Sequence, residues 1–194
     1  RIVFNGNGYA PEWEEEAKRR GLLNLPSMVD AIPALTTEKA VDLFESFHVF
    51  TRAELESRAE IQYEIYAKAV NIEARTMTDI ATKQIIPAVI KYTTVLADSI
   101  NKVRAVGAID VSVQMDLLTQ CSQLLKDTDV AMNKLSEVTL RIPEIPEGRE
   151  RAVYCRETIV PAMEALRRPV DELEMLVDKE MWPMPSYGDL IFEV

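Results

Sequence analysis

Residues 51–70 read TRAELESRAEIQYEIYAKAV, and this stretch decides the fold that we predict. Thr51 and Glu54 have the spacing of a capping box, in which two side chains satisfy backbone N–H groups at the start of a helix. From Leu55 onward, apolar or small residues recur every three or four positions. Their average step of about 3.7 residues keeps them on one side of a long helix without strong supercoiling. The stripe consists of Leu55, Ala59, Tyr63, Tyr66, Val70, Ala74, Met77, Ala81, Ile85, Ala88, Tyr92, Val95, Ser99 and Val103.

Pro87 interrupts this helix and predicts a kink over residues 83–87, because proline lacks an N–H group and collides with the carbonyl four residues earlier. Gly107 is expected to end the helix, and Asp110 to cap the next one. That second helix carries a heptad-like seam, which predicts that it folds back on the first. The seam consists of Leu118, Cys121, Leu125, Thr128, Met132 and Leu135.

Two prolines within residues 141–148 end the second helix, and a further seam then predicts a third long helix. The residues Ile159-Val160-Pro161-Ala162 echo Ile85-Ile86-Pro87-Ala88, which suggests two kinked helices lying side by side. Residues 182–192 are largely apolar but include prolines and a glycine, which break helices, so this tail is expected to run extended. The third seam consists of Cys155, Ile159, Met163, Leu166, Val170, Leu173 and Val177.

Shorter elements precede the bundle. Residues 2–4 are β-prone and predict a strand or extended arm, and Pro11 opens a helix that Gly21 stops. Two further short helical elements are expected, one over residues 27–32, closed by Pro33, and one over residues 37–47.

The predicted fold class is therefore all-α, a kinked bundle of three long helices with short N-terminal helices, an extended N-terminal arm and a C-terminal tail. We divide the chain into 1–50, 51–181 and 182–194, within one structural unit.

Composition narrows the class of partner. The 194 residues carry a net charge of −10, which repels phosphate backbones and anionic lipid, so neither nucleic acid nor a membrane is an expected partner. No apolar run approaches the length of a membrane span. Two cysteines without CxxC spacing fit a reduced, cytoplasmic setting.

The inventory of chemically active residues is poor. His48 is the sole histidine, so neither a catalytic triad nor paired histidine metal ligands can be assembled without it, and we expect it to serve as a helix C-terminal cap or surface residue. Cys121 and Cys155 lie on apolar seams, where cysteines are inert. No phosphate-binding glycine motif is present. The eight methionines are scattered, which favours core filling over a peptide-binding groove. We therefore assign no catalytic, cofactor-binding or metal residues.

Several stretches together resemble one enzyme family. The opening residues 1–25, the run Asn71-Ile72-Glu73-Ala74-Arg75-Thr76-Met77, the run Gln84-Ile85-Ile86-Pro87-Ala88 and the tail Trp182-Pro183-Met184-Pro185-Ser186-Tyr187 are similar to the C-terminal region of type III glutamine synthetases, a large bacterial form of glutamate–ammonia ligase. The similarity covers most of the chain and is thinnest over residues 102–150. The chain begins at Arg1 without an initiator Met, and we expect a catalytic part upstream.

The resemblance implies a parent enzyme that joins ammonia to glutamate through a γ-glutamyl phosphate, using ATP and magnesium or manganese. The family's metal-binding Glu and His motifs and its phosphate-contacting arginines have no counterparts here, so the isolated chain is predicted to be inactive. Its expected role is structural: it packs on the parent catalytic domain and shapes contacts between neighbouring subunits of a homo-oligomer.

Two alternatives remain open from the sequence. The chain is a free-standing helical adaptor that binds partner helices, or it is a bundle enzyme whose helix carboxylates bind a metal ion unaided.

Overall fold

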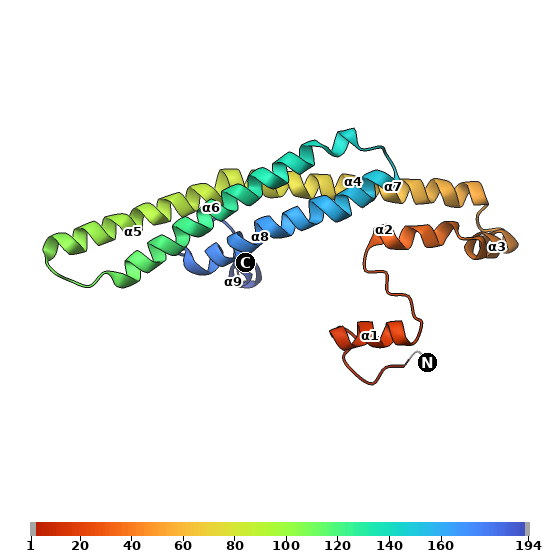
Figure 1. The fold of residues 1–194 in the computed structure, drawn as a ribbon, viewed down its shortest axis with the longest axis horizontal. Helices are drawn as coiled ribbons and strands as arrows, with labels where there is room; N and C mark the ends of the chain where they lie inside the picture. Colours follow the sequence, from red (N-terminus) through yellow and green to blue (C-terminus); the bar gives the residue numbers. More distant parts are fainter. Residues whose placement is uncertain (1–2, 193–194) are drawn as a thin grey trace. The chain divides into compact units, whose positions relative to one another are not determined.

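The protein is described by a computed structural model, which covers residues 3–192. It is built from helices, with no strand among these residues, so the all-α prediction is confirmed (Figure 1). The chain forms two compact units, Arg1–Tyr66 and Ala67–Val194, and each is described here by itself. The three-part division predicted from the sequence stays a prediction. Of the expected arm and tail, residues 1–2 and 193–194 lie outside the described residues.

The first unit begins with α1 (Pro11–Arg19), which has Pro11 in its first turn as predicted. Gly21 follows with a φ of 69°, a left-handed conformation that glycine adopts without strain and that ends the helix. The next helix, α2 (Met28–Ala31), is not closed by Pro33 as we had expected. The chain continues into the 3-10 helix η1 (Ile32–Thr36), because a proline in the first turn needs no N–H partner.

The helix α3 (Glu38–Ser46) ends in a Schellman motif centred on His48. The His48 N–H donates to the Glu45 carbonyl at 3.0 Å, and the Val49 N–H donates to the Phe44 carbonyl at 3.0 Å. His48 has a φ of 54° and an exposed side chain. The prediction that it caps the end of a helix is confirmed.

The long helix α4 (Arg52–Ile80) starts with the predicted capping box. The Thr51 N–H donates to Glu54 Oε2 at 2.8 Å, and the Glu54 N–H donates to Thr51 Oγ1 at 3.4 Å. The hydrogen bonds from Thr51 hold the pKa of the Glu54 carboxyl below its usual value. The reciprocal bonds explain why this helix begins where the sequence predicted.

The predicted kink is a π-helical turn, η2 (Ala81–Ile85), which leads into α5 (Ile86–Val106). The Ile86 N–H donates to the Ala81 carbonyl five residues earlier. A π turn takes up one more residue than an α turn, so the faces of the helix beyond it shift by one residue.

This shift corrects the apolar stripe that we predicted. Leu96 and Ile100 are buried, whereas the predicted Val95 is exposed and Ser99 is half-buried. We had predicted a kink at Pro87 but had continued the spacing of three or four residues across it.

The helix α6 (Ser112–Leu140) returns alongside α5 (Figure 1). Asp110 lies one residue before the N-cap, Val111, and its Oδ1 accepts the Ser112 N–H at 2.9 Å, so it supports the first turn from one position earlier than predicted. None of the six predicted seam residues of this helix is exposed, which confirms the heptad-like pattern.

The third long helix is also interrupted by a π turn. A short 3-10 helix, η3 (Ile142–Glu144), precedes α7 (Arg149–Tyr154), η4 (Cys155–Ile159) and α8 (Val160–Leu176). As in the first long helix, the π turn ends two residues before the proline of the repeated motif. The two similar sequences are therefore each preceded by a π turn.

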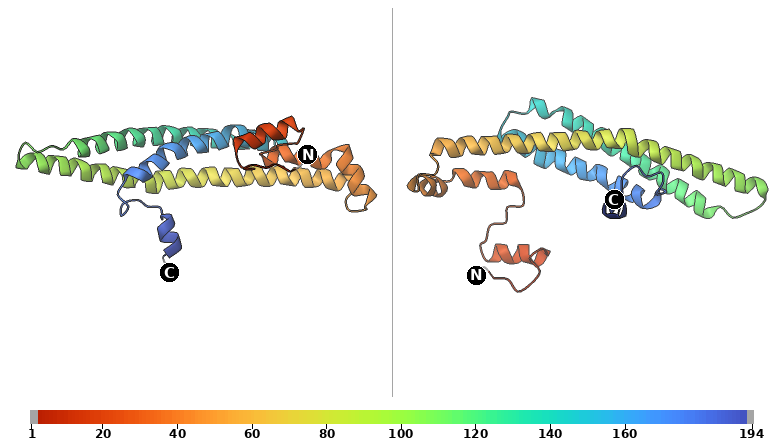
Figure 2. Two further views of the ribbon diagram at one scale, coloured as in Figure 1. Left: turned by 90° about the horizontal axis from the view of Figure 1, so that it is seen from below. Right: turned by 180° about the vertical axis from the view of Figure 1, so that it is seen from behind.

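One core cluster joins the three long helices of the second unit. Ile85 and Val89 from the first pack with Cys121 from α6 and with Leu173 and Val177 from the third. All five are buried. Both kinked helices thus contribute side chains to one core, and the prediction that they lie side by side stays a prediction. Figure 2 shows the long helices of this unit from two further sides.

The tail departs from the extended conformation that we predicted, because it ends in a short helix, α9 (Tyr187–Phe192). The Ser186 N–H donates to Asp189 Oδ2 at 2.7 Å, and the Asp189 N–H donates to Ser186 Oγ at 3.3 Å. Ser186 and Asp189 thus form a second capping box, which we had not recognised behind the prolines. Figure 2 shows α9 projecting from the bundle.

Candidate functional site

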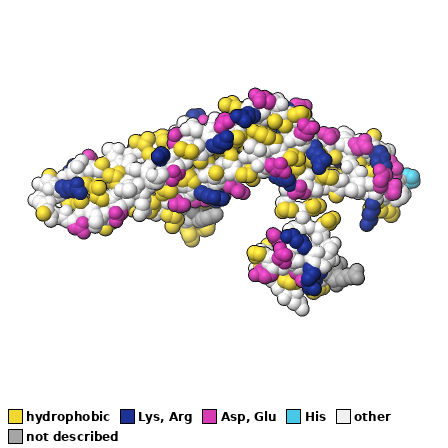
Figure 3. Space-filling view, in the orientation of Figure 1, with side chains coloured by type: hydrophobic (Ala, Val, Ile, Leu, Met, Phe, Trp, Pro, Cys, Tyr) yellow, Lys and Arg dark blue, Asp and Glu magenta, His cyan; other side chains and the backbone are white. Residues whose placement is uncertain are grey.

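The described residues contain no constellation for metal chemistry. Among residues 3–192, no three His, Cys, Asp or Glu side chains are placed to share a metal ion. The charged side chains of the bundle are interspersed by sign over the face seen in Figure 3. The carboxylates therefore do not fit the magnesium or manganese ions that the resemblance implies for the parent enzyme, and we derive no chemistry from them.

The two cysteines are buried and free. Burial raises the pKa of the Cys155 thiol to about 11, against a smaller opposing effect of Arg151, and it also raises the pKa of Cys121. The thiolate is the reactive form of cysteine, so both side chains are poor nucleophiles at neutral pH. The prediction that they are inert packing residues agrees with their burial.

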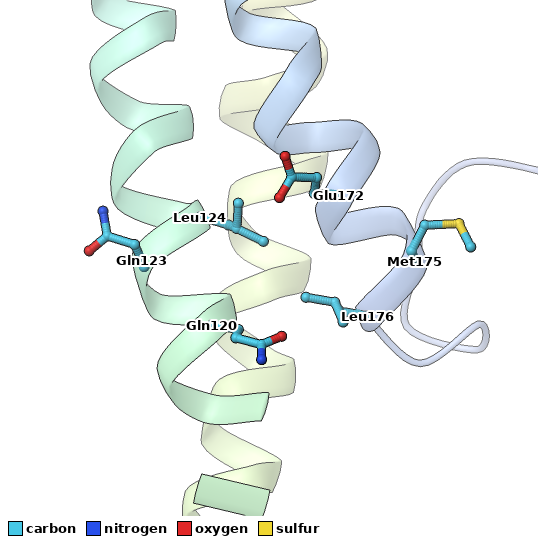
Figure 4. Close-up of a pocket in the computed structure, with 6 residues that line it drawn as sticks. All are labelled: Gln120, Gln123, Leu124, Glu172, Met175 and Leu176. Atoms are coloured by element: carbon cyan, nitrogen blue, oxygen red, sulfur yellow. The ribbon is translucent and has the colours of Figure 1, made fainter. Parts of the chain in front are cut away.

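A shallow pocket of about 490 Å³ lies between α6 and α8 (Figure 4). Leu124 and Leu176 point between the two helices, whereas Gln123 and Met175 point away from each other on opposite sides. Gln120 and Glu172 bring polar groups to the space between the helices, and the remaining lining is apolar or, at Gln123, points away from it. We interpret it as an incompletely filled helix–helix contact.

A larger depression lies beside the tail, and we call it the tail groove. Its volume is about 810 Å³, within the range of roughly 300–1,000 Å³ typical of ligand pockets. The first π turn forms one wall, α8 another and the tail the third. The residues that define the groove are Ile80, Ile85, Leu166, Val170, Trp182 and Met184.

Trp182 connects the tail groove to the core. Its ring packs against the cluster around Ile85 and Leu173, while its indole Nε1 is buried without a hydrogen-bond partner. A buried donor without an acceptor costs about 1–3 kcal/mol. The groove wall therefore carries a polar group whose hydrogen bond is not made within the described chain.

Large apolar side chains remain exposed around the groove. Met175 is 83% exposed and Leu190 is 68% exposed, and both line it; Phe192, at the end of α9, is 81% exposed. Isolated exposed apolar residues are ordinary, but a cluster beside a concave surface is typical of an interaction site.

The methionines correct one of our predictions. Met77, Met175 and Met184 line the tail groove together, although the sequence favoured core filling over a groove. They lie on α4, on α8 and in the tail, so no spacing within a single helix reveals that they share a surface.

A charged contact holds the tail beside the groove. Lys179 Nζ donates to Asp189 Oδ1 at 2.8 Å. This bond and those from Ser186 lower the pKa of the Asp189 carboxyl to about 2. The start of α9 is thus tied to the segment that follows α8.

None of the helices in the described part of the chain is long and apolar enough to cross a bilayer. The candidate site is the tail groove, which is lined mainly by apolar side chains and bordered by the exposed Met175 and Leu190.

Comparison with known proteins identifies relatives whose sequence similarity extends over nearly the whole chain. The family described as the glutamine synthetase C-terminal domain matches residues 1–104. The type-3 glutamine synthetase of Dictyostelium discoideum is 31% identical over 197 residues, which cover 99% of this chain and 27% of that protein. A glutamine synthetase of Butyrivibrio fibrisolvens is 32% identical over 195 residues, covering 100% of this chain and 28% of the relative.

A third relative, a glutamine synthetase of Bacteroides fragilis (strain YCH46), is 29% identical over 196 residues, covering 98% of this chain and 27% of that protein. The chain thus spans little more than a quarter of the length of these curated relatives.

Proposed function

This chain belongs to the family of glutamine synthetase C-terminal domains, and we propose that it is a non-catalytic helical domain that helps a type III enzyme to assemble. The activity proposed for the parent is the ATP-dependent formation of glutamine from glutamate and ammonia. In this proposal, ATP and magnesium or manganese bind to other parts of the parent chain.

The observation that carries the proposal is the exposed apolar border of the tail groove, where Met175 and Leu190 are uncovered. Such side chains are stabilised when another protein surface removes them from water, by about 25 cal/mol per Å² of apolar surface. The partners proposed for them are the parent catalytic domain and neighbouring subunits of a homo-oligomer. All three relatives carry the matching sequence within a longer protein, which favours this role over a free-standing adaptor.

The setting that we propose is the cytoplasm of a bacterium. Two of the three relatives come from bacteria, which supports that origin. The two free, buried cysteines suit a reducing compartment.

The test compares the full-length parent enzyme with a form that lacks residues 182–194 and with the variant Leu190→Asp. We expect both changes to lower the assembled mass measured by light scattering and to reduce glutamine formation. Val130→Asp is the matched control, because Val130 is also exposed on the bundle but does not line the groove. Retention of wild-type mass and activity by the truncated enzyme would refute the assembly role. The isolated 194-residue chain is expected to form no glutamine.

A further inference from the structure

The sulfur atoms of this chain fall into two groups that differ in their exposure to solvent. The two thiols, Cys121 and Cys155, are fully buried, and burial raises the pKa of both. The thioethers lie nearer the surface, and Met175, at 83% exposed, is the most exposed methionine within residues 3–192. An oxidant that reaches this domain therefore meets thioether sulfur before thiol sulfur.

Two of the exposed thioethers belong to the tail groove. Met175 lies on α8 and Met184, which is 40% exposed, lies in the tail, and both line the groove. Figure 4 shows the Met175 side chain pointing out from α8, away from α6. Met77, on α4, also lines the groove but is half-buried. Oxidisable sulfur thus lies on the surface whose apolar border carries the proposed function.

We propose that the tail groove is an oxidation-sensitive surface, in which a peroxide converts Met175 and Met184 to methionine sulfoxide and thereby weakens the contact with the partner. The inference rests on the proposed role in assembly and adds a form of regulation to it. In the assembled enzyme the partner covers the border of the groove, so the reaction takes place on subunits that are newly made or dissociated.

The reaction needs only the exposed sulfur and the oxidant. The thioether sulfur attacks one oxygen of hydrogen peroxide, so that a sulfur–oxygen bond forms as the oxygen–oxygen bond breaks. The proton of the transferred hydroxyl passes to the departing hydroxide, which leaves as water. Sulfur loses two electrons and the peroxide gains them, and methionine sulfoxide reductases reverse the change.

The sulfoxide makes an apolar surface polar. Methionine is flexible and apolar, which suits a border that another protein covers, whereas its sulfoxide carries a hydrogen-bond acceptor. The carboxylates that line the groove, Asp171 and Glu174, accept hydrogen bonds but do not donate them, and Arg167 Nε already donates to Asp171 at 3.0 Å. Burial of a sulfoxide without a donor should weaken association by about tenfold or more.

Peroxide treatment of the full-length parent enzyme tests the proposal. Hydrogen peroxide is added, the oxidised methionines are identified by peptide mass spectrometry, and the assembled mass is followed by light scattering. We expect Met175 and Met184 to gain an oxygen atom before the half-buried Met163, and the assembled mass to fall in parallel. A methionine sulfoxide reductase should restore both the thioethers and the assembled mass.

Leucine variants assign the effect to the groove, because leucine is apolar and of similar volume but has no sulfur. Each variant is compared with its own untreated form. Met175→Leu combined with Met184→Leu should lose much less of its assembled mass in peroxide than the unsubstituted enzyme. The matched control is Met115→Leu, because Met115 is 38% exposed on α6 but does not line the groove, and it should stay as sensitive as the unsubstituted enzyme. Equal sensitivity of the groove variant and the control would overturn the proposal.

Glutamine variants imitate the sulfoxide without an oxidant, so they exclude effects of methionines elsewhere in the parent enzyme. Met175→Gln combined with Met184→Gln should weaken subunit association about tenfold or more, whereas Met115→Gln should leave it unchanged. Unchanged association of the groove variant would also overturn the proposal.

These outcomes are separable from that of the assembly role. If removal of residues 182–194 lowers the assembled mass but neither peroxide nor the glutamine substitutions lower it, the groove acts in assembly without being sensitive to oxidation. If the removal has no effect, the proposed function itself fails, and the inference fails with it.

Discussion

Deleting Gln84 would test how the first π turn and Pro87 depend on each other. Gln84 is exposed within the π turn, so its side chain contributes little to packing. Removing one residue converts the π turn to an α turn and leaves the residues of α5 at their present positions in the bundle. The cost then comes from Pro87, which would lie inside a regular α-helix, and it amounts to about 3 kcal/mol.

The substitution Pro87→Ala and the deletion of Gln84 together form a double-mutant cycle. By itself, the substitution leaves the π turn and the buried face in place, and we expect it to change the free energy of unfolding by less than about 1 kcal/mol. In the deleted chain, the same substitution removes the proline clash and supplies the missing N–H group. The double variant should therefore recover most of the roughly 3 kcal/mol that the deletion costs.

Deletion of Lys91 is the matched control, because Lys91 is also exposed but lies in regular α-helix. This deletion rotates the rest of α5 by about 100° and removes Leu96 and Ile100 from the core. At about 1.5–3 kcal/mol for each side chain, the loss is roughly 3–6 kcal/mol. Urea unfolding followed by far-ultraviolet circular dichroism measures all four variants. The reasoning is refuted if Pro87→Ala does not recover most of the free energy lost on deletion of Gln84, or if it recovers the loss caused by deletion of Lys91 equally well.

Three further predictions concern the core, a cap and the tail. Leu173→Ala should lower the free energy of unfolding by about 2–5 kcal/mol, because Leu173 is fully buried, whereas Met175→Ala, two residues away and exposed, should change it by less than about 0.5 kcal/mol in the same urea titration. Thr51→Ala should cost about 1 kcal/mol by removing the side chain that caps α4, and a loss below 0.3 kcal/mol would contradict the observed capping box. The pKa of the Asp189 carboxyl is lower in the folded chain than in the unfolded chain, so the stability that this carboxylate gives to α9 is complete above about pH 4 and is lost as the pH falls toward 2. Tryptophan fluorescence should report this loss, and Asp189→Asn should abolish the pH dependence.

The long helices were predictable because their signals are local and repeated. The Thr51 and Glu54 box marks the start of α4, and the seam of α6 follows its buried face. The proline at position 87 also predicted where the first helix is perturbed. The spacing of the apolar residues did not reveal whether Pro87 is accompanied by a simple kink or by a π turn. A π turn takes up one extra residue, so the buried residues that follow it lie one position later in the sequence.

The tail groove was harder to predict, because three segments far apart in the chain form it. Met77, Met175 and Met184 have no common spacing, and only tertiary packing brings them to one surface. One local signal was available: Ser186 and Asp189 have the spacing of a capping box, and it would have identified α9. The neighbouring prolines led us to predict an extended chain instead.

The left-handed turn at His48 provides a spectroscopic reporter. His48 is the sole histidine of the chain, and its side chain is exposed at the corner where α3 ends, three residues before the capping residue of α4. Its ring protons therefore give one set of imidazole signals in a nuclear magnetic resonance spectrum, without overlap from another histidine. Because its positive φ exists only while the corner is formed, a change in those signals would follow opening of the corner separately from unfolding of the core of the second unit.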